Sequence, residues 1–138
     1  MRDEGGAAGA RERDAPTIVH NATGLSYASY AEAVVKGRAR IKRFLDADLF
    51  ADPARDILLA VFAAEERGRT VSLTDCEHIA GIPATTTQRW VRTLVARGLL
   101  DRIEDPQDRR RTLLRLTARS RLAMLDYLEH VSPIPLRR

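Results

Sequence analysis

The sequence predicts a mainly α-helical domain with a small β-hairpin, in the arrangement of a winged helix-turn-helix. Three observations between Thr74 and Thr117 lead to this fold class. A short helical segment, a tight turn and a longer helical segment come first, as in a helix-turn-helix. Two strand-like runs follow, and an arginine-rich turn joins them into a hairpin that would form the wing.

Taken in order, the 138 residues are enough for one domain with its own core. Residues 1–25 are expected to form a disordered tail, because they are rich in small and charged residues with almost no large apolar residue before Ile18. The winged-helix domain and its flanking helices then occupy residues 26–131. Residues 132–138 form a C-terminal tail, since Pro133 and Pro135 cannot continue a helix.

Two helices are predicted before the helix-turn-helix. The first runs from Ser26 to Phe50, with apolar residues near helical spacing at Tyr30, Val34, Ile41, Leu45 and Leu49. The second begins at Asp52-Pro53, where Asp52 would be the N-cap and Pro53 the first helical residue. Gly68 would end it, and its core positions would be Ile57, Leu58, Val61 and Phe62.

The helix-turn-helix is predicted to begin beside a short strand over Thr70–Leu73, which would pair with the wing. Thr74-Asp-Cys-Glu77 matches a capping box, so Thr74 is predicted to start the short helix. Gly81 would turn the chain into the next helix, and the residues of the short helix predicted to face the core are Cys76, Ile79 and Ala80.

The longer helix is predicted from Ala84 to Arg97, after Pro83 and before Gly98, which accepts a positive φ. Its core side would carry Thr87, Trp90, Val91 and Leu94. The opposite side carries hydroxyl, amide and guanidinium groups, and no Asp or Glu lies between Pro83 and Arg97. Nothing on this helix would therefore repel a phosphate.

The hairpin is predicted from alternating apolar and polar residues over Leu99–Ile103 and Thr112–Leu116. Glu104–Arg111 would form the turn between these strands, since Asp-Pro starts turns and Pro106 cannot join a ladder. Thr117 would cap a last helix that ends near Val131. Its apolar stripe would contain Leu122, Leu125 and Leu128, broadened by Met124 and Tyr127.

The run from Gly81 to Thr117 resembles the recognition helix and wing of the MarR-type winged-helix regulators. The most specific part is DPQDRR followed by LRLT, similar to the wing of that family and to the Leu-Thr that opens its next helix. The resemblance covers roughly Ile57 to Leu128. Family members often have Ser, Val and Gly where this chain has Pro83, Thr87 and Ser120. A buried Thr87 would need its hydroxyl satisfied, for example by a carbonyl of its own helix.

The distribution of charge agrees with a nucleic-acid partner. The chain has 23 Lys and Arg against 19 Asp and Glu, a formal charge of +4. From Arg89 to Arg121 there are ten arginines and four acidic residues, a local excess of six positive charges. Double-stranded DNA is the predicted partner, with the recognition helix in the major groove and the wing near the minor groove. The candidate DNA-binding residues are Thr85, Thr86, Gln88, Arg89, Arg92, Arg109, Arg110 and Arg111.

An alternative from another class is a winged-helix protein–protein interaction module that does not read DNA sequence, because a fold does not determine its function. Catalysis is not indicated. His20, His78 and His130 lack metal-ligand spacing, and no catalytic arrangement, cofactor loop or metal site is recognisable. We therefore expect no enzyme activity and no cofactor. Cys76, the one cysteine, is expected to be a buried core thiol rather than a redox sensor.

The location and assembly follow from other features. No apolar run approaches the ~20 residues of a membrane span and no secretory signal is visible, so we expect a cytoplasmic protein without a membrane partner. The resemblance implies a homodimer formed by the first and last helices. The last helix is shorter than in the family, which leaves the dimer geometry open. The resemblance also leaves room for a small-molecule effector, which the sequence does not identify.

Overall fold

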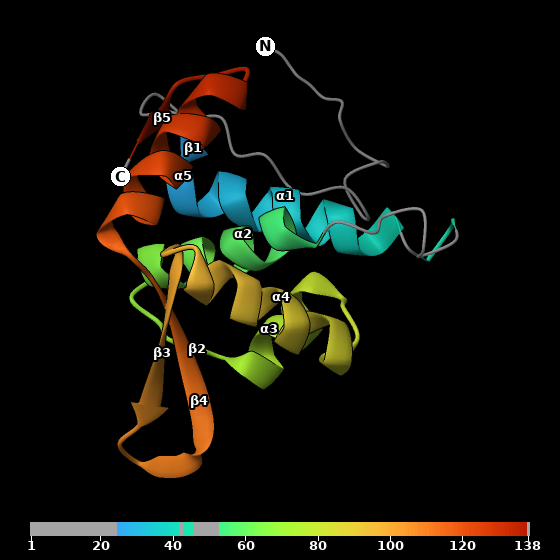
Figure 1. Ribbon diagram of the computed structural model, residues 1–138. Helices are drawn as coiled ribbons and strands as arrows, with labels where there is room; N and C mark the ends of the chain where they lie inside the picture. Colours follow the sequence, from blue (N-terminus) through green and yellow to red (C-terminus); the bar gives the residue numbers. More distant parts are fainter. Residues whose placement is uncertain (1–24, 42, 46–52, 138) are drawn as a thin grey trace.

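The computed structural model describes residues 25–41, 43–45 and 53–137. The order of elements is β1 (Leu25–Ser26), α1 (Tyr27–Ile41), α2 (Ala54–Glu66), β2 (Val71–Ser72), α3 (Leu73–Ala80), α4 (Ala84–Ala96), β3 (Leu100–Asp105), β4 (Asp108–Leu116), α5 (Ala118–Val131) and β5 (Leu136–Arg137). In Figure 1, α3, α4 and the β3–β4 hairpin lie below α1, and α5 lies above it. The predicted fold class, a winged helix-turn-helix, is confirmed.

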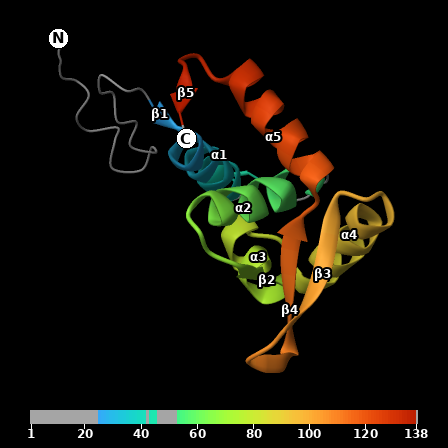
Figure 2. The same cartoon turned by 90° about the vertical axis from the view of Figure 1, so that its left-hand side faces the viewer.

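The wing is part of a three-stranded antiparallel sheet with the order β2-β4-β3. The predicted short strand does pair with the wing, with Val71 opposite Leu114. At the base of the hairpin Leu100 lies opposite Leu116. These four side chains are buried, so the root of the wing is anchored in the core while its far end projects from the body (Figure 2).

The core is built around α2. Its predicted core residues Ile57, Val61 and Phe62 are fully buried, whereas Leu58 is only partly buried. Gly68, at φ +73°, follows the helix as predicted. The helix begins at Ala54 with Pro53 as its N-cap, so Pro53 is not the first helical residue. Asp52, the predicted N-cap, lies outside the described residues.

The first helix differs from its prediction in length and in orientation. It ends at Ile41 and is followed by a turn in which the Leu45 N–H donates to the Ile41 carbonyl at 3.1 Å. The buried face consists of Tyr27, Ala28, Ala31 and Val35, whereas Ile41 and Leu45 are 39% and 52% exposed. Small alanines allow α1 to lie close to α2, and the larger predicted residues therefore fall at the edge of the contact or outside it. Leu49 lies outside the described residues.

The predicted start of α3 is wrong by two residues. Ser72 is the N-cap: its Oγ accepts from the Asp75 N–H at 3.0 Å, and the Asp75 carboxylate accepts from the Ser72 N–H at 3.1 Å. Thr74 lies inside the helix, because pairing of Val71 and Ser72 with β4 brings the chain directly from strand into helix. Cys76 and Ala80 are buried as predicted, but Ile79 is 39% exposed.

The last helix keeps its predicted cap and end, and all of its predicted apolar stripe except Leu122 packs on the core. The Thr117 hydroxyl accepts from the Ser120 N–H, and the helix ends at Val131. Ser120, Met124 and Leu128 are buried, whereas Leu122 is 64% exposed. Ser120 fits this position because its hydroxyl donates to the Leu99 carbonyl at 2.7 Å.

The C-terminal residues pack back on the start of α1 instead of forming a free tail. Leu136 and Arg137 pair in parallel with Leu25 and Ser26. The Tyr27 hydroxyl also donates to the Glu129 carboxylate of α5. Within the described residues, no helix is long and apolar enough to cross a lipid bilayer. The predicted N-terminal tail lies outside the described residues, apart from Leu25, which is buried.

The corrected capping box makes a prediction about stability. Ser72→Ala should lower the free energy of unfolding by about 1 kcal/mol, because it removes the side-chain acceptor of the first turn of α3. Thr74→Ala is the matched control and should change it by less than about 0.5 kcal/mol, as for an ordinary surface position. Denaturant unfolding measures both, and an equal loss in the two variants would contradict the assignment of Ser72 as the cap.

Candidate nucleic-acid interface

One edge of α4 is held in the core. Thr87, Val91 and Leu94 are at most 3% exposed, and they recur at the spacing of one helix face. The Thr87 hydroxyl donates to the Pro83 carbonyl at 3.0 Å, which satisfies this buried polar group within its own helix as expected. Gly98, at φ +75°, ends the helix at the predicted place.

The opposite edge of α4 faces solvent. Thr85, Gln88, Arg89 and Arg92 are exposed, and Thr86 is half-buried. The side chains of Gln88, Arg89 and Arg92 have no hydrogen-bond or ion-pair partner in the described part of the chain, and α4 itself contains no acidic residue. Between Thr85 and Arg92, this edge therefore presents hydrogen-bond donors along about two turns of helix.

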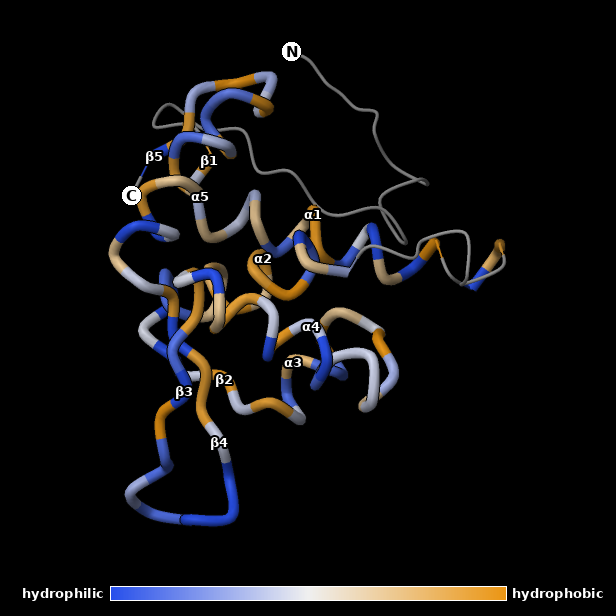
Figure 3. Tube along the Cα trace, viewed as in Figure 1, coloured by the Kyte–Doolittle hydropathy of each residue, from blue (hydrophilic) through white to orange (hydrophobic). Residues whose placement is uncertain are grey.

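The wing has a tighter turn than predicted. Pro106 and Gln107 alone separate the strands, and the three consecutive arginines belong to β4. Asp105 lies opposite Asp108 and Glu104 opposite Thr112, so Arg109–Arg111 form an irregular, bulged part of β4. A bulge locally re-aims side chains. The tip is uniformly hydrophilic in Figure 3.

The three arginines differ in their partners. Arg109 is exposed and has no side-chain partner among the described residues. Arg110 is also exposed, and its Nε lies 3.2 Å from Asp108; this hydrogen bond lowers the pKa of the Asp108 carboxyl. Arg111 lies 3.3 Å from both Asp105 and Asp75. Arg109 and Arg110 are therefore available to a ligand, whereas Arg111 joins the wing to α3.

Two carboxylates have a positioning role, and the sequence indicated one of them, Asp105, but not Asp75. Asp105 is nearly buried, accepts from the Gln107 N–H at 2.9 Å and so shapes the turn of the wing. Asp75 closes the capping box of α3 and also holds Arg111. The Asp-Pro turn pointed to Asp105, but no sequence signal connects Asp75 with a residue 36 positions away.

Of the remaining candidate groups, Cys76, His78 and His130 lie within the described residues, whereas His20 does not. Cys76 is fully buried, and burial, followed by the nearby carboxylates of Glu77, Asp75 and Asp56, raises the pKa of its thiol to about 12. A thiol that stays protonated at neutral pH is a poor nucleophile, in agreement with the expected core role. His78 is exposed. Within the described residues, no group of three or more His, Cys, Asp or Glu side chains could hold a metal ion.

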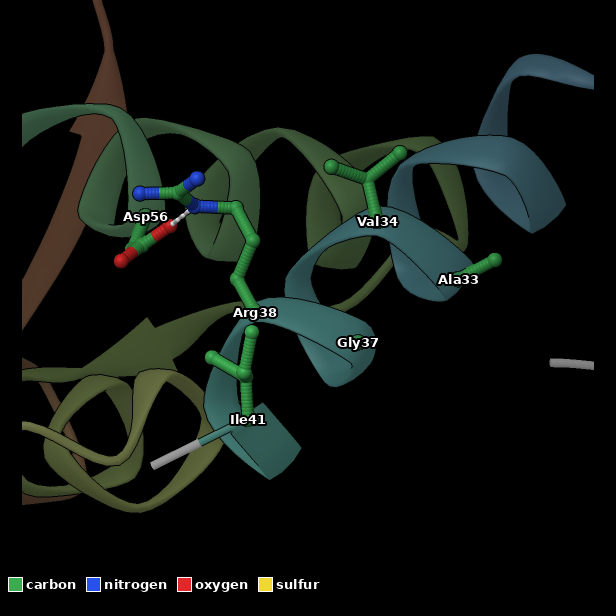
Figure 4. Close-up of a pocket in the computed structure, with 6 residues that line it drawn as sticks. All are labelled: Ala33, Val34, Gly37, Arg38, Ile41 and Asp56. Atoms are coloured by element: carbon green, nitrogen blue, oxygen red, sulfur yellow. Dashed lines mark hydrogen bonds and ion pairs between the residues drawn. The ribbon is translucent and has the colours of Figure 1, made fainter. Parts of the chain in front are cut away.

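A hollow of about 330 Å³ lies apart from α4 and the wing, on α1 and the first turn of α2. Figure 4 shows Arg38 reaching from α1 to the buried carboxylate of Asp56, beside the apolar side chains of Val34 and Ile41. A Cβ atom added to Gly37 would have no neighbouring side chain or other element within 4 Å. The hollow is therefore open, with apolar walls and one ion pair.

One protein-family model and several solved structures are similar to parts of this chain. Residues 55–120, just under half of the chain, match the family model of the winged helix DNA-binding domain. A search of curated protein sequences found no match. Among solved structures, the chain is similar to the transcriptional repressor CouR bound to a 23-mer DNA duplex, with 25% identity, 54% of this chain and 51% of CouR covered, and a TM-score of 0.46.

Two further structures have comparable similarity. The complex of MepR from S. aureus with DNA has 21% identity, 66% of this chain and 72% of MepR covered, and a TM-score of 0.47. A variant of MarR from E. coli has 15% identity, 73% of this chain and 67% of MarR covered, and a TM-score of 0.48. The chain thus spans about half the length of CouR and a larger share of the other two.

The different partners of Arg109 and Arg111 predict different effects on the order of the wing. Arg111→Ala removes the ion pair that holds the tip against Asp75 of α3 and the ion pair with Asp105 within the wing, so backbone amides of β3 and β4 should exchange with solvent several-fold faster. The loss in global stability should stay within about 1 kcal/mol, because ion pairs between exposed groups contribute little. Arg109→Ala should leave exchange unchanged. Hydrogen exchange followed by mass spectrometry measures the exchange rates in both variants. Equal rates in the two variants would show that the ion pairs of Arg111 do not order the wing.

Proposed function

We propose that this chain, in which residues 55–120 form a winged helix DNA-binding domain, is a MarR-like, sequence-specific transcription regulator that binds double-stranded DNA. The observation that carries the proposal is the exposed edge of α4. It bears Gln88, Arg89 and Arg92 without partners among the described residues and without an acidic neighbour on the helix. Such free donors match the acceptors of base edges and phosphates.

The proposed mode of binding places α4 in the major groove. An amide such as Gln88 can bond an adenine edge in a bidentate manner, and a guanidinium such as Arg89 or Arg92 can do so with guanine. The hydroxyls of Thr85 and Thr86, at the first turn of the helix, would contact phosphates, which fix register without reading sequence. Discrimination between sequences would therefore come mainly from Gln88 and Arg89.

The wing would act beside the groove that α4 occupies. Arg109 and Arg110 extend from the tip and would contact the backbone or the minor groove, where negative potential attracts arginine. Arg111 is proposed to act mainly by positioning the tip, because Asp105 and Asp75 already occupy its guanidinium. The wing would thus add affinity that falls with salt concentration.

A protein–protein interaction module remains the alternative from a different class. It requires neither sequence preference nor salt-dependent affinity for duplex DNA. The proposal also includes a cytoplasmic location, no enzymatic activity and no cofactor. A small-molecule effector is left unidentified, although the hollow beside Arg38 and Asp56 offers room for one.

The regulator is further proposed to be a homodimer. Large apolar side chains are exposed at Ile41, the last residue of α1, at Phe44 and Leu45 in the turn after it, and at Leu122 and Val131 on α5. In a dimer with two-fold symmetry, these exposed patches would be buried against the partner protomer. Two winged helices related in this way would read half-sites about one helical turn of DNA apart, or a multiple of it.

The α4 proposal predicts a loss of discrimination without a loss of fold. Gln88→Ala and Arg89→Ala should each reduce the preference for a selected duplex over a scrambled one by about 1–3 kcal/mol, the value of a good base contact. Lys36→Ala, which removes an exposed side chain from α1, is the control and should leave the preference intact. Fluorescence anisotropy gives both affinities. Parental discrimination in both α4 variants would show that this edge does not read bases.

The dimer is tested by charging the exposed apolar patches. Deletion of α1 is unsuitable, because Tyr27, Ala31 and Val35 belong to the core. Phe44→Asp combined with Leu122→Asp changes two side chains that are 76% and 64% exposed, so the fold should survive. We expect light scattering to show a dimer for the parent at micromolar concentration and a monomer for the double variant. A monomeric parent, together with a selected site that lacks an inverted repeat, would contradict the dimer.

A further inference from the structure

Three elements meet at one carboxylate behind the wing. Glu65, in the last turn of α2, accepts from the Leu116 N–H at 2.9 Å through one oxygen and forms an ion pair with Arg121 of α5 through the other. Leu116 is the last residue of β4. The carboxylate of Glu65 therefore joins the root of the wing to α2 and to α5.

The surroundings of Glu65 make this junction rigid. The side chain of Glu65 is 15% exposed and that of Arg121 is 29% exposed. Arg121 also pairs with Glu66 at 2.8 Å, and its guanidinium lies 5.8 Å from the centre of the Phe62 ring. Loss of the Glu65 carboxylate would leave the Leu116 N–H without this acceptor in a mostly buried setting, a costly change.

The junction lies at the root of the hairpin, so a small change of angle there moves the tip by several ångströms. Along the paired strand β3, five residue steps lead from Leu100, which lies opposite Leu116, to Asp105 at the tip; this corresponds to roughly 17 Å at ~3.3 Å per residue. A rotation of about 10° at the root would therefore move the tip by roughly 3 Å on this spacing, enough to lose a phosphate contact. Figure 2 shows the wing leaving the body where β4 passes into α5, next to α2.

We propose that Glu65 is a positioning residue that sets the direction of the wing, and that Arg121 couples the position of α5 to it. The inference rests on the proposed contact of the wing with DNA. A change at α5, such as the binding of a second copy of the chain, would reach Arg109 through Arg121, Glu65 and the Leu116 N–H. The base-reading edge of α4 is not part of this connection.

The matched test compares Glu65→Ala with Glu66→Ala. Both remove one carboxylate partner of Arg121, and Glu65→Ala also removes the acceptor of the Leu116 N–H in the wing. In anisotropy titrations at several salt concentrations, Glu65→Ala should reduce the slope of log K against log salt by roughly one, the share of one phosphate contact. Glu66→Ala should keep the parental slope, and both should keep the preference for the selected duplex. Arg121→Met should act in the same direction as Glu65→Ala.

A second measurement does not depend on DNA. Trypsin cleaves after arginine, and the initial rate of cleavage at Arg109–Arg111 reports the freedom of the tip. It should rise several-fold in Glu65→Ala and remain parental in Glu66→Ala. If Glu65→Ala does not fold by circular dichroism, Glu65→Met, which keeps the apolar part of the side chain but has no oxygen acceptor, replaces it, with Glu66→Met as the control and the same direction expected.

The outcomes separate the two proposals. Equal effects of the Glu65 and Glu66 substitutions on cleavage, or no effect of either, overturn the positioning role. A parent that binds no duplex overturns the proposed function, while the cleavage rates still decide the role of Glu65. If the parent binds, the double variant Glu65→Ala/Arg109→Ala should show the slope of Arg109→Ala alone, and a further loss of one unit would show that Glu65 does not act through the wing tip.

Discussion

The burial of one edge of α4 is the constraint on which the rest of the interface depends. Val91 and Leu94 each gain about 1.5–3 kcal/mol from burial relative to exposure, and both are almost completely buried. This packing determines which residues of a 13-residue helix face solvent. Thr87 can share the buried edge because the Pro83 carbonyl accepts from its hydroxyl. Because Thr87, Val91 and Leu94 are buried, the opposite edge of the helix, with Gln88, Arg89 and Arg92, faces solvent.

The root of the wing is anchored by buried apolar side chains, and two polar contacts add to this. Arg111 reaches Asp75 at the start of α3, and the Leu116 N–H reaches Glu65 at the end of α2. One contact lies towards the tip and the other at the root, so together they define the direction of the hairpin. Exposed ion pairs contribute little to stability. Their role in this protein is better described as orientation, which a hairpin with one free end requires.

Local signals predicted the elements well where a single residue type decides the outcome. Pro83 and Gly98 marked the ends of α4, and Thr117 marked the start of α5. The start of α3 was misplaced because Ser72 and Thr74 are both followed three residues later by an acid, and β2 pairing decides between them. Ile79 and Leu122 were assigned to the core because periodicity gives a face but does not say which neighbour covers it.

Local sequence signals did not predict contacts between residues that are far apart in the chain. The sequence identified the arginine cluster of the wing, but not that Arg111 is held by Asp75, 36 residues away. The pairing of β5 with β1 was missed for the same reason, since residues 132–138 have no strand pattern of their own. Side-chain pairing of this kind depends on the packed fold, and the candidate site was therefore predicted as a set of residues rather than as a geometry.

The proposal that α4 and the wing read DNA is tested most directly by selecting bound sequences from a random duplex pool. The selected duplex and a scrambled duplex of the same composition would then be titrated at two salt concentrations. Sequence-specific binding predicts that both affinities fall steeply with salt, because phosphate contacts release counterions, while the selected duplex stays at least about a thousandfold tighter. Enrichment of no sequence, with equal affinity for the two duplexes, would contradict the account.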